Sequence, residues 1–493
     1  MSIIDVRNLT FGYDGTAENV FENTSFRLDT DWKLGFTGRN GRGKTTFLKL
    51  LMGEYKYSGR ITASVGFEYF PYAVDESELA IDAARSINPD VMDWELEREL
   101  SLLSVGSDAL RRSFSTLSMG ERTKLLLAVM FTKPNSFLLI DEPTNHLDME
   151  ARGITAEYLN SKRGFILVSH DRAFLDACTD HTLSINRANI EVTSGNFSVW
   201  YENKQLRDAF ELSENEKLKQ EISRLKSAAR EKSAWSDVAE GRKIGFDPRK
   251  TEKSLNRRAW EGAKSKKLQA RAKAIEKRTD AMIDEKSSLL KNLEETEDLR
   301  LNPLTFHSKR LVEFRKADFS YGVARIFDNF DFTLSQGERV AVVGANGSGK
   351  STLLKLILGE LEFDRAESVY FANGLKFSYL RQDVSLLSGS IDDFGQGIDR
   401  VLFRAILRKL GFSRGMFEKP LETYSAGQKK KAALAKSLSE PAHIYVWDEP
   451  MNYIDIYSRM QIEELVKRSD ATIIFVEHDR AFCDSAATRI IRL

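Results

Sequence analysis

Two short glycine-rich segments carry residues that could bind phosphate. Residues 38–45 read GRNGRGKT and residues 344–351 read GANGSGKS, and each follows an apolar stretch that predicts a β-strand. In such a loop, glycines let backbone amides turn toward phosphate oxygens, the lysine bridges those oxygens, and the next hydroxyl can bind a divalent cation. We therefore predict two phosphate-binding loops at strand-to-helix turns, with Lys44 and Lys350 as their cations.

Two buried strands are predicted to end in paired acids. FLLIDEP (residues 137–143) ends in Asp141 and Glu142, and IYVWDEP (residues 444–450) ends in Asp448 and Glu449. Beside a phosphate loop, the aspartate could hold magnesium directly or through water, and the glutamate could polarise an attacking water molecule. The alternative is a capped strand edge without chemistry. The phosphate loops favour hydrolysis of a nucleotide.

The spacing of these motifs predicts an internal duplication. The two loop lysines are 306 residues apart, and the two glutamates are 307 apart. LSMGE (residues 117–121) and YSAGQ (residues 424–428) place Ser118 and Ser425 307 residues apart. His170 in SHDRAF and His478 in EHDRAF are 308 apart. A shared register across four motifs is typical of two copies of one domain.

These four motifs, in this order, resemble the ATP-binding cassette family, and the resemblance covers both halves of the chain. It implies an α/β fold with two P-loop ATP-binding cassette domains in tandem, joined by an antiparallel α-helical hairpin linker. It also implies hydrolysis of ATP to ADP and phosphate, with ATP and Mg²⁺ as cofactors. The LSMGE and YSAGQ segments would sit at helix starts and complete the opposite half's site, giving a monomer with two head-to-tail ATP sites.

The resemblance implies a role for each matching residue. His170 and His478 are expected to contact the γ-phosphate, or alternatively to be packed in the core. Tyr13 and Tyr321 are expected to stack on adenine, or alternatively to be core residues. The catalytic candidates are Glu142, Glu449, His170 and His478. The nucleotide-binding candidates are Tyr13, Gly38, Asn40, Gly41, Gly43, Lys44, Thr45, Thr46, Tyr321, Gly344, Asn346, Gly347, Gly349, Lys350, Ser351, Thr352, Ser118, Gly120, Ser425 and Gly427. The metal candidates are Thr45, Asp141, Ser351, Gln382 and Asp448.

Some positions depart from the family pattern, among them DEPMNYID at residues 448–455, where the first half has DEPTNHLD at residues 141–148. The expected glutamine after the first core strand is present as Gln382 in YLRQD, but the first half has Tyr72 in EYFPYAV. Magnesium ligation or coupling at the first site is therefore expected to differ. Because both catalytic glutamates are present, we expect two working sites with unequal rates.

The middle of the chain is strongly basic, although the whole chain has a net charge of zero. Residues 217–278 contain 20 Lys and Arg against 8 Asp and Glu, a net charge of +12. Apolar residues at helical spacing predict two antiparallel arms of about 38 residues, or about 55 Å each. The turn is expected at about residues 241–262. We predict domains at residues 1–202 and 299–493, with the linker at residues 203–298.

A spacer between two domains needs no charge of one sign, whereas a nucleic-acid partner does, because lysine and arginine release counterions from phosphates. No apolar run approaches the roughly 18 residues of a membrane span, and the N-terminus lacks a leader pattern. We expect a cytoplasmic protein without a membrane partner. Cys178 and Cys483 are too few for a disulfide framework or a thiolate metal site.

Two cassettes joined by a basic hairpin, with DEPTNHLD at residues 141–148, resemble the ABC-F family. WKLGFTGRNGRGKTTFLKLL (residues 32–51), EYFPY (residues 68–72) and the short segment between the first phosphate loop and LSMGE resemble, within it, the Lsa-like antibiotic-resistance branch. That resemblance implies binding to the ribosome near the tRNA exit site, with the linker tip reaching large-subunit rRNA and P-site tRNA. The tip would displace lincosamides, pleuromutilins and group A streptogramins. The tip candidates are Lys243, Ile244, Phe246, Arg257, Arg258 and Trp260.

Several alternatives stay open. Phe246 and Trp260 could cap the hairpin's own small core instead of meeting RNA. The chain could be a housekeeping ABC-F factor that acts on stalled ribosomes without a drug. A DNA-maintenance ATPase is disfavoured, since such proteins split one cassette around a long coiled coil or carry zinc cysteines, and no DNA partner is expected. A soluble exporter subunit would leave the basic hairpin unexplained.

Overall fold

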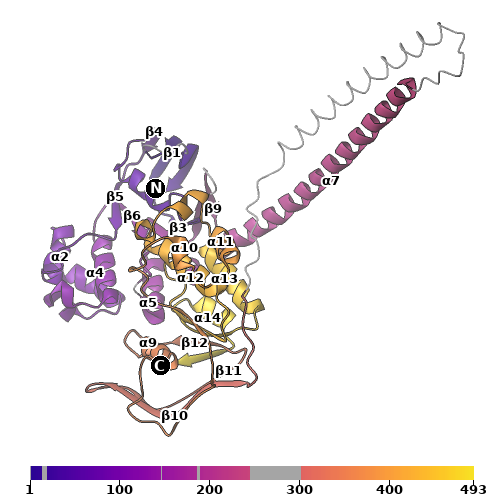
Figure 1. The fold of residues 1–493 in the computed structure, drawn as a ribbon. Helices are drawn as coiled ribbons and strands as arrows, with labels where there is room; N and C mark the ends of the chain where they lie inside the picture. Colours follow the sequence, from indigo (N-terminus) through magenta and orange to yellow (C-terminus); the bar gives the residue numbers. More distant parts are fainter. Residues whose placement is uncertain (1, 14–18, 146, 186–188, 245–300) are drawn as a thin grey trace, which may run out of the picture. The chain divides into compact units, whose positions relative to one another are not determined.

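A computed structural model describes residues 2–13, 19–145, 147–185, 189–244 and 301–493 of the chain. The chain divides into two compact units, one made of Met1–Trp200 with Thr296–Leu493 and the other of Tyr201–Glu295. Within the larger unit we call residues 2–200 the first lobe and residues 301–493 the second lobe. Figure 1 colours the first lobe indigo to magenta and the second lobe salmon to yellow.

The first lobe is built on a six-stranded sheet. The strand order is β5-β6-β7-β3-β8-β9, and every neighbouring pair is parallel except β8 and β9. Its central strands are apolar runs buried on both faces, as parallel strands covered on both sides require. The strands are β3 (Lys33–Thr37), β5 (Gly66–Phe70), β6 (Ser136–Asp141), β7 (Phe165–Val168), β8 (His181–Ile185) and β9 (Ile190–Ser194).

A second, antiparallel sheet packs against the helix that follows the first phosphate loop. Its strands β1 (Ile3–Phe11), β2 (Phe21–Asp29) and β4 (Ser58–Thr62) pair in the order β2-β1-β4. Phe47 of α1 (Lys44–Leu51) is fully buried, and its ring meets those of Phe21 and Phe36 edge to face. This aromatic contact fixes α1 between the two sheets and so fixes the direction in which the loop points.

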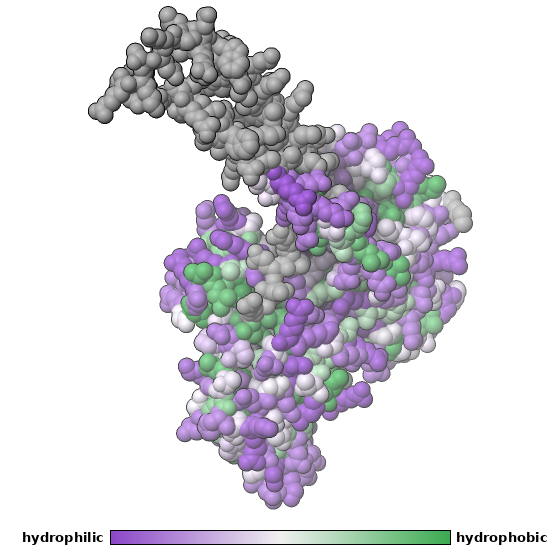
Figure 2. Space-filling view, turned by 90° about the vertical axis from the view of Figure 1, so that its right-hand side faces the viewer, coloured by the Kyte–Doolittle hydropathy of each residue, from purple (hydrophilic) through white to green (hydrophobic). Residues whose placement is uncertain are grey.

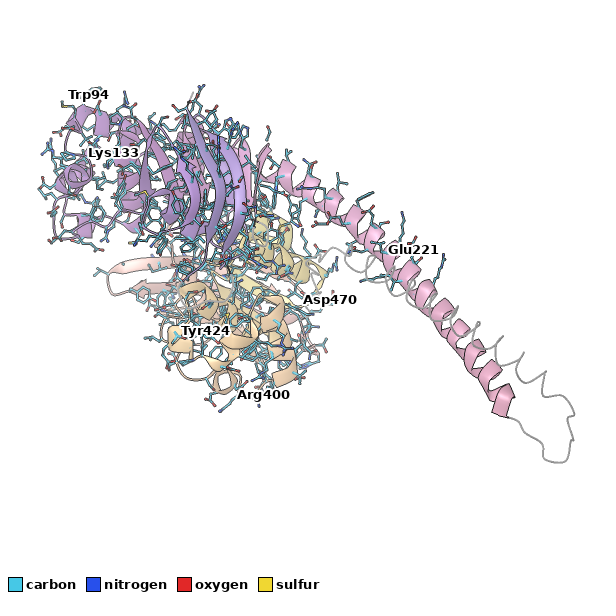
Figure 3. All side chains as sticks on the ribbon, turned by 90° about the horizontal axis from the view of Figure 1, so that it is seen from above. Trp94, Lys133, Glu221, Arg400, Tyr424 and Asp470 are labelled. Carbon is cyan, nitrogen blue, oxygen red and sulfur yellow. The ribbon has the colours of Figure 1, made fainter. Side chains whose placement is uncertain are left out.

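Helices complete the first lobe. They are α2 (Ala80–Ile87), α3 (Asp93–Leu102), α4 (Met119–Phe131), α5 (Met149–Asn160) and α6 (Arg172–Cys178), with short 3₁₀ segments at Ser107–Arg111 and Phe114–Thr116. α2 and α4 pack together (Figure 1). Trp94 lies on the exposed side of α3, with 61% of its surface accessible (Figure 3).

The second lobe repeats this plan. Its main sheet has the order β14-β15-β16-β12-β17, and all its neighbours are parallel. An antiparallel sheet β11-β10-β13 packs beside α9. The strands are β10 (Arg310–Tyr321), β11 (Ala324–Ser335), β12 (Arg339–Val343), β13 (Ser368–Phe371), β14 (Phe377–Leu380), β15 (Ile444–Asp448), β16 (Thr472–Val476) and β17 (Arg489–Arg492). The prediction of two tandem α/β domains is confirmed.

The second lobe's helices follow the same order along the chain. They are α9 (Lys350–Ile357), α10 (Ile391–Phe394), α11 (Arg400–Lys409), α12 (Ala426–Ser439), α13 (Ile456–Arg468) and α14 (Arg480–Ala486), with 3₁₀ segments at Arg414–Glu418 and Leu421–Thr423. The face of the protein seen in Figure 2 is mainly hydrophilic, with small hydrophobic patches between charged residues. Among the described residues, no helix is long and apolar enough to cross a membrane.

One long helix, α7 (Phe197–Ile244), leaves the first lobe. Its 48 residues correspond to about 72 Å. At its start Trp200 is buried and meets Tyr457 of the second lobe edge to face. Lys243 and Ile244 are its last two residues, and their side chains are not described. The expected turn and second arm, with Phe246, Arg257, Arg258 and Trp260, lie outside the described residues.

Candidate active sites

The first phosphate loop closes around its lysine. Lys44 Nζ donates to the carbonyl of Gly38 at 2.7 Å and to Asn40 Oδ1 at 3.3 Å, and burial lowers the pKa of Lys44. Gly43 has a left-handed φ of 98°, and a Cβ there would lie 2.5 Å from Val20 Cγ1. The glycine is therefore required by both backbone conformation and space.

The second phosphate loop has the same construction. Lys350 Nζ donates to the carbonyls of Gly344 at 2.9 Å and Ala345 at 2.7 Å. Gly349 also has a φ of 98°, and a Cβ there would lie 2.4 Å from Ile326 Cγ2. In both loops the backbone turn directs the following helix, α1 or α9, with its N-terminus toward the loop, which favours phosphate there.

Each loop places a hydroxyl beside an aspartate, which suits a divalent cation. Thr45 Oγ1 donates to Asp141 Oδ2 at 2.8 Å, and Tyr69 donates its hydroxyl to the same oxygen at 3.0 Å. In the second lobe Ser351 favours the charged form of Asp448, and Asp448 Oδ1 is buried without a hydrogen-bond partner among the described residues. Burial raises the pKa of both aspartates. A buried carboxylate oxygen that has no hydrogen-bond partner and lies beside a hydroxyl is a suitable ligand for Mg²⁺.

The first glutamate and histidine lie side by side. His170 Nε2 is 3.3 Å from Glu142 Oε1 and 3.0 Å from Asn40 Oδ1. Burial, with Asp141 adjacent, raises the pKa of Glu142 to about 8. Burial and the charge of Lys44 hold the pKa of His170 well below its usual range, so this histidine is neutral. A neutral imidazole can donate one hydrogen bond here without adding charge.

The second glutamate has a different environment. Burial alone would raise the pKa of Glu449, but the nearby polar groups of His478 and Gln382 outweigh burial and lower it. His478 Nε2 is 3.7 Å from Glu449 Oε1. Both glutamates share one unusual feature, a left-handed backbone with φ of 52° at Glu142 and 49° at Glu449. Non-glycine residues in this region are strained, and such strain clusters at functional sites.

Strand register shows that the two sites have different residues, Tyr72 and Gln382, at one equivalent position. Phe70 pairs with Ile140 and Leu380 pairs with Trp447, so Tyr72 and Gln382 occupy equivalent positions two residues later. The Tyr72 side chain does not bond to Asp141 or Glu142 but to another carboxylate.

The Tyr72 hydroxyl donates to Glu68 Oε2 at 2.9 Å, and Lys133 forms an ion pair with the same carboxylate at 2.9 Å. Lys133 lies in the first lobe (Figure 3), with its ammonium 5.5 Å from the centre of the Tyr72 ring. Tyr69 reaches the aspartate instead.

Residues from both lobes line one cavity of about 640 Å³ at the first site. Lys44, Glu142 and His170 line it from the first lobe, and Ser425 and Gly427 line it from the second. This is the head-to-tail placement that the sequence predicts for Ser425 and Gly427. A Cβ at Gly427 would lie 2.8 Å from the carbonyl of Tyr453, so this close approach requires glycine.

The second site also has a link between the lobes. The backbone amide of Asn346 donates to Asp148 Oδ2 of the first lobe at 3.4 Å. Ser118 caps α4, accepting from the amide of Glu121 at 3.2 Å, and Gly120 follows within the first turn. The remaining loop candidates, Gly41, Thr46, Gly347 and Thr352, lie in their phosphate loops or the first turns of α1 and α9.

Both candidate adenine-stacking tyrosines are exposed. Tyr13 is 43% accessible, lines the first cavity and shares a hydrogen bond of 2.7 Å with Thr46 Oγ1. Tyr321 is 49% accessible and meets Phe319 edge to face at 5.0 Å. Such exposure is unlike that of core residues.

Sequence analysis missed three residues at these sites. Tyr69 lies on the opposite face of β5 from residues 68 and 70, and this alternation along the strand is the signal that could have identified it. Lys430 and Lys431 follow YSAGQ within an apolar helix, where lysines are unusual enough to be a signal. Lys431 lines the first cavity and donates to Asp455 Oδ2 at 2.5 Å.

Comparisons with known proteins agree with this geometry. The family described as ABC transporter matches residues 21–145 and 327–452. The "Ribosome protection protein VmlR" of Bacillus subtilis is 28% identical over 98% of this chain and 85% of its own length. The "ATP-binding protein Uup" of Caulobacter vibrioides is 30% identical over 97% of this chain and 75% of its own length.

Solved structures support the fold. The archaeal ribosome recycling factor aABCE1, in complex with the stalk protein aP1, has a TM-score of 0.64 at 18% identity, covering 98% of this chain and 87% of its own. The "RNase-L Inhibitor" has a TM-score of 0.63 at 17% identity, covering 99% and 87%. With two duplicated phosphate-loop lobes and these relatives, the chain belongs to the ATP-binding cassette family and is an ABC-F ATPase, which hydrolyses ATP.

Proposed function

We propose that this ABC-F ATPase binds the ribosome near the tRNA exit site in its ATP-bound state and acts there through its basic linker. The observation that carries the proposal is the first cavity, which both lobes line. A nucleotide held by Lys44 on one side and Ser425 on the other would join the lobes. Loss of the γ-phosphate removes the group that both lobes hold, so hydrolysis would release the protein.

The site geometry supports a hydrolytic role for both glutamates and both histidines. Glu142 and Glu449 would orient the attacking water, and His170 and His478 would contact the γ-phosphate. Tyr13 and Tyr321 would stack on adenine. Bound Mg²⁺ would neutralise charge on the phosphate oxygens, with Thr45 and Asp141 holding it at the first site and Ser351, Gln382 and Asp448 at the second.

The basic linker supports a partner rich in phosphate. A net charge of +12 over residues 217–278 suits rRNA and P-site tRNA, which are recognised by shape and charge more than by sequence. The relative named a ribosome protection protein supports the finer proposal, that the linker tip displaces lincosamides, pleuromutilins and group A streptogramins. The place of action would be the cytoplasm.

A drug-independent role on stalled ribosomes is the second candidate, because the relative at 30% identity is named only for ATP binding. Expression in a susceptible bacterium separates the two. A rise in the inhibitory concentration of the three drug classes supports protection, and unchanged concentrations with a function in stalled translation support the second candidate.

Ribosome binding itself is tested by pelleting. The Glu142→Gln, Glu449→Gln double variant should pellet with ribosomes in the presence of ATP and much less without it. Because this variant cannot hydrolyse ATP, it stays in the ATP-bound state. Binding should fall steeply as salt rises, since the contacts are with phosphate. Binding that is equal with and without ATP would contradict the proposal.

A further inference from the structure

Lys430 is a buried cation whose partners all belong to the second site. It is 1% exposed, and its ammonium donates to the carbonyls of Arg381 at 2.8 Å, Gln382 at 3.2 Å and Asp448 at 3.1 Å. An ammonium group has three donors, so these carbonyls satisfy it completely. The lysine therefore fixes the backbone that carries Gln382 and the end of the strand that carries the second aspartate and glutamate.

The helix that carries Lys430 begins at the other site. α12 starts after its cap Ser425, and both Ser425 and Gly427 line the first cavity. Lys430 follows the cap by five residues, about 7.5 Å along the helix axis. Because a helical turn is rigid, a shift of α12 toward nucleotide at the first site must also move the ammonium of Lys430.

The path continues to the catalytic group of the second site. The carbonyl of Asp448, which accepts from Lys430 at 3.1 Å, belongs to the residue directly before Glu449. The side chain of Gln382, whose own carbonyl also accepts from Lys430, favours the charged form of Glu449 by lowering its pKa. A displacement of Lys430 is thus transmitted through one backbone segment to the carboxylate that would orient water.

The first lobe has a different residue at the equivalent position. Thr123 follows Ser118 by five residues, and its hydroxyl donates to the carbonyl of Met119 within its own helix, at 3.0 Å. Tyr72, which is equivalent to Gln382, bonds to Glu68 rather than to a catalytic carboxylate. The contacts that join α12 to the second site are therefore not repeated by the residues at the matching positions of α4.

We propose that Lys430 is a positioning residue that couples the two ATP sites in one direction, so that nucleotide at the first site promotes hydrolysis at the second. The inference rests on the roles proposed above for Lys44, Ser425 and Glu449. It makes the first site a control site for the second.

The test is a double-mutant cycle on single-turnover ATP hydrolysis at the second site, measured in the full-length protein. In the Glu142→Gln background the first site binds ATP without hydrolysing it, and adding Lys44→Ala empties that site. With Lys430 present, emptying the first site should slow second-site turnover about tenfold; with Lys430→Met, it should change turnover less than about twofold. An undiminished tenfold effect in K430M would overturn the proposal.

Direction and folding are controlled separately. Lys350→Ala should change first-site turnover, measured in Glu449→Gln, equally with or without K430M. Thr123→Val is the matched control in the first lobe and should leave the dependence on Lys44 intact. If K430M fails to fold, Lys430→Gln, whose amide keeps two donors, should give an intermediate dependence; a full tenfold dependence in K430Q would count against the proposal.

Failure of the site assignments would look different. If Glu142→Gln and Glu449→Gln do not each silence one hydrolysis event, the assigned catalytic roles are wrong. If each does silence one event and the cycle is additive, only the coupling is wrong.

Discussion

The side-chain amide of Asn40 donates a hydrogen bond of 3.0 Å to the backbone carbonyl of Tyr453, joining the first phosphate loop to the second lobe. The oxygen of the same side chain lies 3.0 Å from His170 Nε2 and accepts from Lys44 Nζ at 3.3 Å. One amide thus links the loop lysine, the histidine and the opposite lobe.

Asn40→Ala should slow first-site hydrolysis roughly 30- to 150-fold, because two to three hydrogen bonds of about 1 kcal/mol each are lost around the loop. Single-turnover hydrolysis in the Glu449→Gln background measures this. Asn346→Ala is the matched change in the second loop and should affect mainly second-site hydrolysis. Equal effects of both variants on both sites would contradict this assignment.

The positions of Gln382 and Tyr72 should respond differently to substitution. Gln382→Ala removes the polar side chain that lowers the pKa of Glu449 and should slow second-site hydrolysis about tenfold, the scale of one hydrogen bond of about 1 kcal/mol. Tyr72→Phe removes only the bond to Glu68 and should leave first-site hydrolysis within about twofold. A large loss in Y72F would show that the tyrosine acts on the chemistry after all.

Tyr69→Phe should weaken the response of the first site to magnesium. The hydroxyl stabilises the charged form of Asp141, and its loss should raise the half-saturating magnesium concentration about three- to tenfold, equivalent to about 1 kcal/mol. A magnesium titration of hydrolysis in the Glu449→Gln background measures this shift. In the same variant the second site, measured in Glu142→Gln, serves as the internal control and should not change.

Glu99 joins α3 to α5 and should matter for stability. Its buried carboxylate accepts from the Tyr158 hydroxyl at 2.6 Å and also pairs with Lys162 and Arg98. Burial opposes ionisation, but these partners lower the pKa of Glu99. Glu99→Gln should lower the free energy of unfolding by about 1–3 kcal/mol at pH 7.

The pH dependence of that effect has a definite sign. Because the folded pKa of Glu99 lies below the unfolded value of about 4.3, its contribution is fully present above about pH 4.3. It is lost as the pH falls through the folded pKa. Urea unfolding of the wild type and E99Q should therefore differ at pH 7 and converge in acid; a gap that widens below pH 4 would contradict the stabilising role of the charged form.

Sequence patterns predicted the two-lobed fold because apolar strands, glycine turns and paired acids are local signals. They also predicted that Tyr72 stands where glutamine is expected, since EYFPYAV in the first half corresponds to YLRQD in the second. They did not predict that Tyr72 turns to Glu68 while Tyr69 reaches Asp141, because the direction of a side chain beyond a strand end depends on its neighbours in space. Lys430 escaped for the same reason, as its three acceptors are backbone carbonyls from distant segments.

The left-handed backbone at Glu142 and Glu449 sets activity against robustness. Each of these φ angles, 52° and 49°, costs a side-chain-bearing residue about 1–3 kcal/mol that glycine would not incur. Libraries selected only for heat resistance would therefore enrich glycine at these two positions. The selected proteins would be more thermostable but would no longer hydrolyse ATP. Any effort to make this protein more durable has to screen for turnover in the same round.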